Sequence, residues 1–284
     1  MELNKVYNMD CLEYMRGLED NCIQNIITDP PYLYLDHKLD KDFNQELFFK
    51  ECFRLLKDDG FLVFFGFGQS YHYWNYLCNK IGFNHKEDLI WDKGHNTSPF
   101  GIVARQHESI SIFTKKDGKL NDVRIDYLED RIANNNLQGI EQDLSRILSS
   151  FKNIKTFDDF NKFKNEVVID DVKHGITAGK KTSKDRGCKM LETIQNGFKC
   201  KSIIRVKREH YQMEHPTAKP QKLMEMLIRL TDINNNIVYD PFSGSGSTLL
   251  KCKELSINYI GTELDKDYFN IINKRLEQVQ GSLF

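Results

Sequence analysis

The chain has 284 residues, of which 40% are hydrophobic and 12% aromatic, which allows one substantial core and a smaller additional unit. Its formal net charge of −1 excludes a protein that is basic throughout, and the apolar run 61–67 is too short to cross a bilayer, so no membrane association is expected. Seven scattered cysteines without a C-x-x-C pair argue against disulfides and zinc and predict a reducing, cytoplasmic location.

Residues 1–116 alternate between apolar runs and amphipathic patterns, which predicts strands and helices in turn. One helix is expected at 45–57, with Gly60 as its stop, and another begins at Ser70 as its N-cap. Strands are expected at 23–28, 61–65, 89–91 and 109–114. Repeated units of this length predict an α/β fold with a Rossmann-like, doubly wound and mainly parallel sheet.

The first chemical motif is Asp29-Pro30-Pro31-Tyr32, directly after the strand at 23–28. Each proline fixes φ and has no N–H, and Pro31 also holds Pro30 in an extended conformation. The Asp29 carboxylate and the Pro30 carbonyl can therefore accept both hydrogens of one amino group. Tyr32 adds a flat face beside these acceptors. A plain turn after a strand is the structural alternative.

The periodicity weakens at 117–213, where the connections are too long for a compact α/β core. We expect an inserted region of helices and loops, with helical patterns near 138–151 and 157–163. Residues 172–213 hold eleven Lys or Arg against three acids, whereas 120–171 hold seven against eleven. This local charge predicts contact with nucleic-acid phosphates, with a solvated charged surface as the alternative. The candidate contacts, mostly on an expected loop at 175–189, are Lys173, Lys180, Lys181, Lys184, Arg186 and Lys189.

A second motif lies where a strand at 237–239 leads through a glycine-rich turn into a helical pattern at 248–255. Glycines let a backbone approach a ligand, and the N–H groups that open the helix face it. A further strand at 258–262 ends at Glu263, where an acid suits ribose hydroxyls. These features together indicate an adenosine-containing ligand. The turn comprises Asp240, Pro241, Phe242, Ser243, Gly244, Ser245, Gly246, Ser247 and Thr248.

The two motifs, in this order, resemble those of the S-adenosylmethionine-dependent DNA amino-methyltransferases, in the arrangement of the β group of that family. The resemblance covers most of the chain and implies a class I methyltransferase fold. It makes residues 1–116 the catalytic half, 117–213 a target-recognition insert and 214–284 the cofactor-binding half. It also implies that Asp29, Pro30, Pro31 and Tyr32 are the catalytic residues.

The same resemblance implies the residues that hold S-adenosylmethionine. Asp10 and Cys11 are expected at its adenine and Glu263 at its ribose, although Asp10 is equally suited to cap the helix that follows it. Asp265 is expected to cap the last helix, at 266–279. Phe242 to Gly246 are expected to wrap the methionine side, with Lys219 near its carboxylate. The other residues expected to bind the cofactor are Asp29, His215, Thr217, Asp240, Pro241, Ser247 and Thr248.

Aspartate as the first residue of the catalytic motif implies adenine N6 as the acceptor, and cytosine N4 is the alternative within the family. The expected partner is double-stranded or already single-stranded DNA, whose target base leaves the stack and lies on Tyr32. Phage-type relaxed specificity is favoured, restriction-modification is the usual context, and a homodimer is a family-based expectation. A nicotinamide-dependent oxidoreductase or a catalytically silent DNA-binding module would leave the first motif unexplained. His107 and Glu108 either line the acceptor side or form a structural pair, and no metal is expected.

Overall fold

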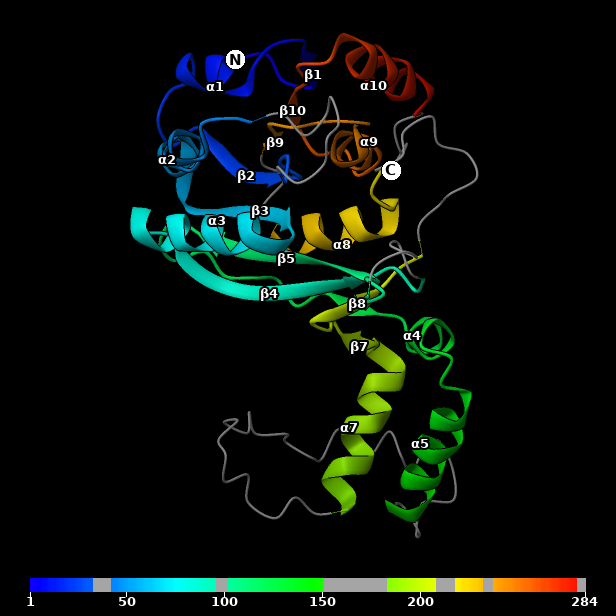
Figure 1. Cartoon of the computed structure of the whole chain (residues 1–284). Helices are drawn as coiled ribbons and strands as arrows, with labels where there is room; N and C mark the ends of the chain where they lie inside the picture. Colours follow the sequence, from blue (N-terminus) through cyan, green and yellow to red (C-terminus); the bar gives the residue numbers. More distant parts are fainter. Residues whose placement is uncertain (33–41, 96–101, 151–182, 208–217, 232–236, 280–284) are drawn as a thin grey trace. The chain divides into compact units, whose positions relative to one another are not determined.

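The computed structural model describes residues 1–32, 42–95, 102–150, 183–207, 218–231 and 237–279 (Figure 1). The chain divides into two compact units, a larger one of residues 1–123 and 201–284 and a smaller one of Arg124–Cys200. In the larger unit, the described strands form an eight-stranded sheet in the order β1-β10-β9-β2-β3-β5-β4-β8. The strand β8 falls inside the expected insert at 117–213 but pairs with β4 in this sheet.

Among these described strands, β5 is antiparallel to both of its neighbours, and all other neighbouring pairs are parallel. The mainly parallel, doubly wound sheet is therefore confirmed. One edge collects the carboxyl ends of the parallel strands and the start of β5; we call it the carboxyl edge, marked by Asp29, Asp92, His107, Asp240 and Glu263. The strands are β1 (Lys5–Tyr7), β2 (Ile23–Thr28), β3 (Leu56–Gly66), β4 (Asn84–Asp92), β5 (His107–Thr114), β8 (Ile203–Arg205), β9 (Val238–Asp240) and β10 (Tyr259–Thr262).

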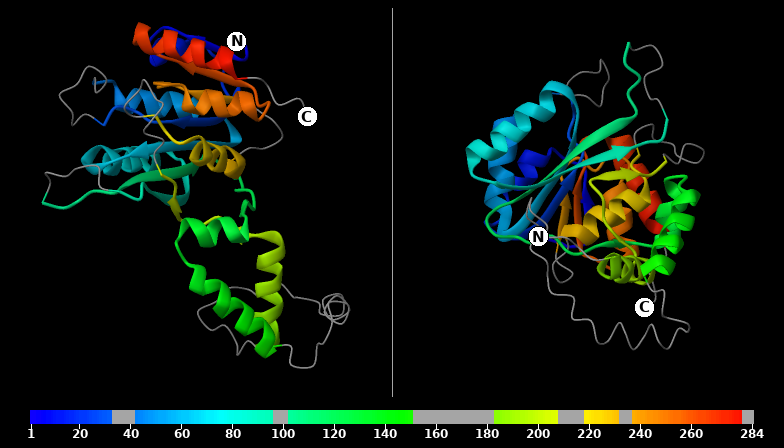
Figure 2. Two further views of the ribbon diagram at one scale, coloured as in Figure 1. Left: turned by 90° about the vertical axis from the view of Figure 1, so that its right-hand side faces the viewer. Right: turned by 90° about the horizontal axis from the view of Figure 1, so that it is seen from below.

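Helices cover both faces of the sheet (Figures 1 and 2). One face carries α1 (Cys11–Arg16), α2 (Gln45–Leu55) and α3 (Gly68–Ile81), and the other carries α8 (Gln221–Thr231), α9 (Ser247–Glu254) and α10 (Lys266–Gln278). The core under the first group is aromatic: the rings of Phe49 and Phe64 lie 5.5 Å apart and those of Phe64 and Trp74 6.0 Å. Full burial of such a side chain contributes about 1.5–3 kcal/mol, so this face anchors the fold.

Two local predictions were wrong. Gly60 does not stop a helix, because α2 ends at Leu55 and Gly60 lies inside β3, where a Cβ would approach the Gln24 carbonyl oxygen to 2.7 Å. Ser70 does not cap α3, which begins at Gly68 without a side-chain cap; its hydroxyl donates instead to a carbonyl of the catalytic motif. The expected caps at Asp10 and Asp265 are confirmed, because each carboxylate accepts two backbone N–H groups of its helix.

The smaller unit contains α4 (Tyr127–Ala133), α5 (Leu137–Ser150) and α7 (Ser183–Asn196), with a ribbon of β6 (Arg124–Ile125) and β7 (Phe198–Lys199). The helix predicted near 138–151 corresponds to α5, which lies beside α7 (Figure 2). The expected loop at 175–189 was partly wrong, because the chain is helical from Ser183 onward. The Tyr127 hydroxyl donates to the buried Asp143 carboxylate at 2.9 Å, which ties α4 to α5.

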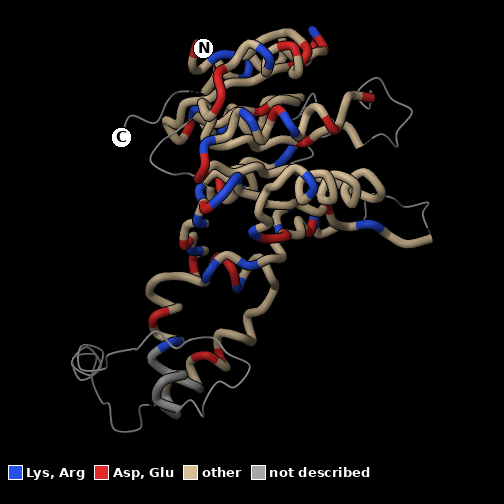
Figure 3. Tube along the Cα trace, turned by 90° about the vertical axis from the view of Figure 1, so that its left-hand side faces the viewer, with Lys and Arg blue, Asp and Glu red and all other residues tan. Residues whose placement is uncertain are grey.

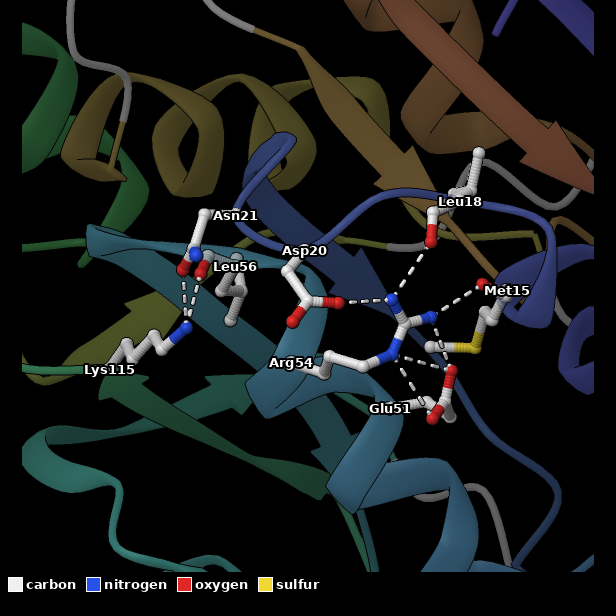
Figure 4. Close-up of polar contacts among 8 residues, drawn as sticks. All are labelled: Met15, Leu18, Asp20, Asn21, Glu51, Arg54, Leu56 and Lys115. Carbon is white, nitrogen blue, oxygen red and sulfur yellow. Dashed lines mark hydrogen bonds and ion pairs between the residues drawn. The ribbon is translucent and has the colours of Figure 1, made fainter.

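The edge of the sheet opposite the carboxyl edge is tied together by Arg54 at the end of α2 (Figure 4). Its guanidinium donates to the carbonyl oxygens of Met15 and Leu18, both at 2.8 Å. It also donates to the carboxylates of Asp20, at 2.7 Å, and Glu51, at 2.6 Å. These bonds fix the end of α1 and the segment that enters β2.

No helix in the described parts of the chain has the length and apolar character that crossing a membrane requires.

Candidate active site at the carboxyl edge

The two sequence motifs lie side by side in the sheet. Asp29 directly follows β2 and Asp240 ends β9, and these strands are parallel neighbours in which Ile26 pairs with Tyr239. The Thr28 hydroxyl donates to the Asp240 carboxylate at 2.9 Å, a buried bond between residues 212 positions apart in the chain. The chain winds one way from β2 to β3 and the other way from β9 to β10. Such a switch point is where open α/β sheets bind ligands.

The catalytic motif is held by a hydrogen bond within it and by another from α3. The Tyr32 hydroxyl donates to Asp29 Oδ1 at 2.5 Å, and the Ser70 hydroxyl donates to the Tyr32 carbonyl oxygen at 2.6 Å. Pro30 is buried, whereas the Asp29 side chain keeps 28% of its surface exposed. The carboxylate is therefore fixed by the protein and still open to a ligand. No local sequence signal distinguished Ser70 from a helix cap.

Lys219 lies on the catalytic carboxylate. Its ammonium group donates to Asp29 Oδ2 and lies 3.3 Å from Glu108 Oε2. Burial alone would lower the pKa of Lys219, but the negative charges of Asp29 and Glu108 outweigh burial and raise this pKa above its ordinary value. The lysine is thus a cation beside Asp29. The backbone N–H of Lys219 also donates to the Ser247 hydroxyl at 3.2 Å, which links this segment to the glycine-rich turn.

The glycine-rich turn has the conformation that its glycines allow. Gly244 and Gly246 adopt φ values of 52° and 79°, and a Cβ on Gly246 would meet Ile272 at 3.0 Å. The Glu263 carboxylate accepts the N–H groups of Gly244, at 2.7 Å, and Asp265, at 2.8 Å. Burial raises the pKa of Glu263. A close backbone approach with a half-buried acid beside it suits an uncharged, hydroxyl-bearing group such as ribose.

Asp240 is an almost fully buried acid at the start of the glycine-rich turn. It is 3% exposed, and burial raises its pKa to about 7, although bonds from Thr28, Thr248 and the backbone N–H of Phe242 favour the ionised form. The Phe242 N–H lies 3.3 Å from Asp240 Oδ1. These bonds hold the start of the turn against β2, so the Asp240 side chain fixes the position of the turn.

An aromatic layer connects the catalytic motif to the turn. The Tyr32 ring lies 6.1 Å from that of Trp74, which lies 6.4 Å from Phe43. Phe43 and Phe48 contact Phe242 of the turn at 5.1 Å and 5.3 Å between ring centroids. Trp74 and Phe48 are fully buried, so this layer supports Tyr32 and Phe242 from within the core.

The N-terminal segment reaches the same edge through β1, which is paired with β10. The Asn8 side chain donates to the Glu263 carbonyl oxygen at 2.8 Å, so the residues that follow β1 lie beside the end of β10. Both cap bonds of Asp10 go to Oδ1. Cys11 is buried, and burial raises the pKa of its thiol to about 12, which disfavours the nucleophilic thiolate.

Several predicted site residues lie outside the described part of the chain. They are His215, Thr217, Lys173, Lys180, Lys181 and the side chains of Lys184 and Arg186. Lys189 is described and exposed, and its ammonium pairs with Glu192 at 2.9 Å. Figure 3 shows basic and acidic positions interspersed along the described helices of the smaller unit. The residues that sequence reasoning missed at the carboxyl edge are Thr28, Ser70 and Lys93.

Comparison with known proteins identifies the family. The sequence profile described as DNA methylase matches residues 23–274, so the chain belongs to the DNA methylase family. The type II methyltransferase M.HinfI of Haemophilus influenzae is 25% identical over 98% of this chain and 69% of the relative.

Solved structures show the same fold. The complex of M1.HpyAVI with SAM is similar with a TM-score of 0.57 and 24% identity, covering 96% of this chain and 99% of that chain. A PvuII DNA methyltransferase described as cytosine-N4-specific is similar with a TM-score of 0.60 and 15% identity, covering 99% and 88%. The fold is that of the class I methyltransferases.

Proposed function

We propose that this protein transfers a methyl group from S-adenosylmethionine to the N6 amino group of adenine in DNA. One observation carries this proposal: the Asp29 carboxylate, held by Tyr32 and Lys219 but still partly exposed, lies at the sheet's switch point beside the glycine-rich turn. A methyl acceptor on Asp29 and a donor in the turn would share one cleft. The family defines the chemistry as DNA methylation, and the resemblance of the catalytic motif supports adenine as the base.

The residues around the turn fit the proposed methyl donor. Glu263 would hold the ribose, and Asp10, the N-cap of α1 three residues after β1 ends, would lie toward the adenine. The backbone of Gly244 and Gly246, whose positive φ values shape the turn, would contact the methionine part. Lys219 lies beside both the turn and Asp29 and would contact the methionine part of the cofactor. When bound, S-adenosylmethionine supplies an activated methyl group on its sulfonium.

Asp29 and Pro30 would hold the acceptor. The adenine amino nitrogen is a poor nucleophile because its lone pair is delocalised into the ring. Two acceptors, the Asp29 carboxylate and the Pro30 carbonyl, would bind both hydrogens and favour a pyramidal nitrogen with its lone pair released. The carboxylate would then stabilise the positive charge that develops on that nitrogen. The amine would take the place of the Tyr32 hydroxyl on Asp29 Oδ1, and the freed tyrosine ring would stack on the base.

Adenine is favoured over cytosine by the first residue of the motif, an aspartate. An ionised carboxylate accepts hydrogen bonds but donates none, so it matches the amino group of either base, and the preference for adenine comes from the resemblance of the whole motif. Cytosine N4 is the second candidate, because a cytosine-N4-specific enzyme has the same fold.

A nucleoside assay tests the proposal. The full-length protein is incubated with isotope-labelled S-adenosylmethionine and a random-sequence DNA duplex, which is then digested and analysed by mass spectrometry. We expect N6-methyladenine with the wild type and none with Asp29→Ala. Label on N4-methylcytosine alone would establish the second candidate instead. A wild-type protein that binds the donor but leaves all bases unmethylated would contradict both.

The same DNA tests the specificity. The Lys- and Gly-rich composition of residues 172–213 supports phosphate contacts more than base reading, so we propose relaxed sequence specificity. Sequencing the methylated positions is expected to show adenines in many contexts. Enrichment of one short motif would overturn this part of the proposal and leave the choice of base untouched.

A further inference from the structure

Four charged side chains of alternating sign form a line that ends at the catalytic carboxylate. The ammonium of Lys93 donates to Glu108 Oε1, and the ammonium of Lys219 lies 3.3 Å from Glu108 Oε2. Lys219 also donates to Asp29 Oδ2. The side chain of Lys93 is 1% exposed and that of Glu108 9%, so these charges are nearly removed from water.

The line crosses the carboxyl edge from one strand to the next. Lys93 follows β4, Glu108 lies at the start of β5, and Asp29 follows β2. From β3, between β5 and β2, the Phe65 ring lies 4.8 Å below the Lys219 ammonium. The Trp91 ring lies 5.1 Å from the Lys93 ammonium. Aromatic faces attract cations and exclude water, so the ammonium groups have little freedom to move.

A buried ion pair with a purely structural role requires only one lysine and one glutamate. Here Glu108 contacts two lysines, and Lys219 contacts two carboxylates. Buried charges interact strongly because little water screens them. The strength with which Lys219 holds Asp29 therefore depends on how fully Lys93 compensates Glu108. A change at Lys93 is transmitted to Asp29 through two intervening side chains.

We propose that Lys93 and Glu108 are positioning residues for methyl transfer, acting through Lys219 to fix the orientation of the Asp29 carboxylate and the negative charge that it presents to the amine. This inference rests on the proposed function. In this proposal neither Glu108 nor Lys93 contacts the substrate amine. Both residues affect turnover through Lys219.

The sign of the coupling gives a sharp test. Lys93→Met removes one of the two lysines that contact Glu108, so Glu108 draws Lys219 away from Asp29 and the rate falls. The double variant Lys93→Met/Glu108→Gln removes one charge of each sign, and Lys219 then pairs with Asp29 alone. The second substitution should therefore restore what the first one loses. Two unrelated structural defects would instead add.

Lys115 offers a matched control. It is also a buried lysine, but it donates to the Asn21 side chain at 2.6 Å and the Leu56 carbonyl oxygen at 2.9 Å, at the opposite edge of the sheet (Figure 4). Lys115→Met removes a buried ammonium of the same kind without touching the line of charges. We expect it to lower the thermal midpoint of unfolding and to leave kcat unchanged.

The experiment measures kcat, the KM for DNA and the KM for S-adenosylmethionine for wild type and the three variants, on the DNA pool used above. We expect Lys93→Met to lower kcat about tenfold with both KM values within about twofold, and the double variant to recover to within about threefold of wild type. Thermal unfolding verifies that each variant is folded at the assay temperature.

The outcomes separate this inference from the function on which it rests. A wild-type protein that methylates no DNA would reject the proposed function itself. An active wild type with an unchanged Lys93→Met variant, or with a double variant slower than Lys93→Met, would overturn the positioning role alone. If Lys93→Met does not fold, the double variant decides the question, because a tenfold loss in that variant also contradicts the proposal.

Discussion

Asp240 gives this fold a pH-dependent stability whose size follows from its burial. Burial raises the pKa of Asp240 to about 7, whereas an aspartate in an unfolded chain titrates near 4. The folded protein therefore binds this proton more tightly than the unfolded chain does. The contribution to stability is fully present below about pH 4 and is lost as pH rises through about 7. At about 1.4 kcal/mol per pH unit, the difference corresponds to about 4 kcal/mol.

The substitution Asp240→Asn imitates the neutral acid and removes this dependence. Its Oδ1 can still accept from the Thr28 hydroxyl and the Phe242 N–H. We expect the free energy of unfolding of the variant, relative to that of wild type, to rise by about 3 kcal/mol between pH 5 and pH 8. The reason is that ionisation of the buried Asp240 lowers the stability of wild type over this range, whereas the asparagine of the variant does not titrate. Urea unfolding followed by tryptophan fluorescence at several pH values measures the difference. A difference that stays constant with pH would refute the reasoning.

Three further substitutions separate support of the site from support of the fold. Ser70→Ala removes the donor to the Tyr32 carbonyl, so single-turnover transfer should slow about tenfold for a stability loss of about 1 kcal/mol; an unchanged rate would count against this support. Arg54→Met should lower the free energy of unfolding by about 2 kcal/mol, measured in urea, with kcat unchanged; a lower kcat in the folded variant would contradict its distance from the site. Gly246→Ala places a side chain on a residue with φ of 79° and should weaken S-adenosylmethionine binding, measured by calorimetry, about tenfold. The control Gly17→Ala, at φ of −83°, should leave the affinity unchanged. Equal affinities of the two variants would contradict a role of the turn in binding the cofactor.

The fold was largely predictable because its elements carry local signals. The apolar run of β2 and the apolar stripe of α2 are local patterns, so a few neighbouring residues are enough to predict each element. The local reading failed where a distant backbone decides the outcome. Gly60 resembles a helix stop, but it is a glycine because the Gln24 carbonyl passes close to it in the folded sheet. Likewise β8 is too short to stand out, and only its pairing with β4 makes it a strand.

The site was predictable in its two motifs and not in the contacts between them. Asp29 and Gly246 lie in patterns whose residue types restrict the backbone, so the sequence signals them directly. Lys93 is one lysine among many in the sequence, and its meaning comes from Glu108, which a strand pairing brings beside it. The role of Ser70 depends in the same way on where the chain after β2 passes α3. Such contacts exist only in the folded sheet.

The account depends most directly on the Asp29 carboxylate as the group that grips the acceptor amine opposite the methyl donor. Asp29→Asn keeps the shape of this side chain and removes its charge. We predict that methyl transfer to DNA falls by about a hundredfold or more, while the dissociation constant for S-adenosylmethionine changes by less than about fivefold. Turnover of the Asn variant at the wild-type rate, with the label still on adenine N6, would contradict the account.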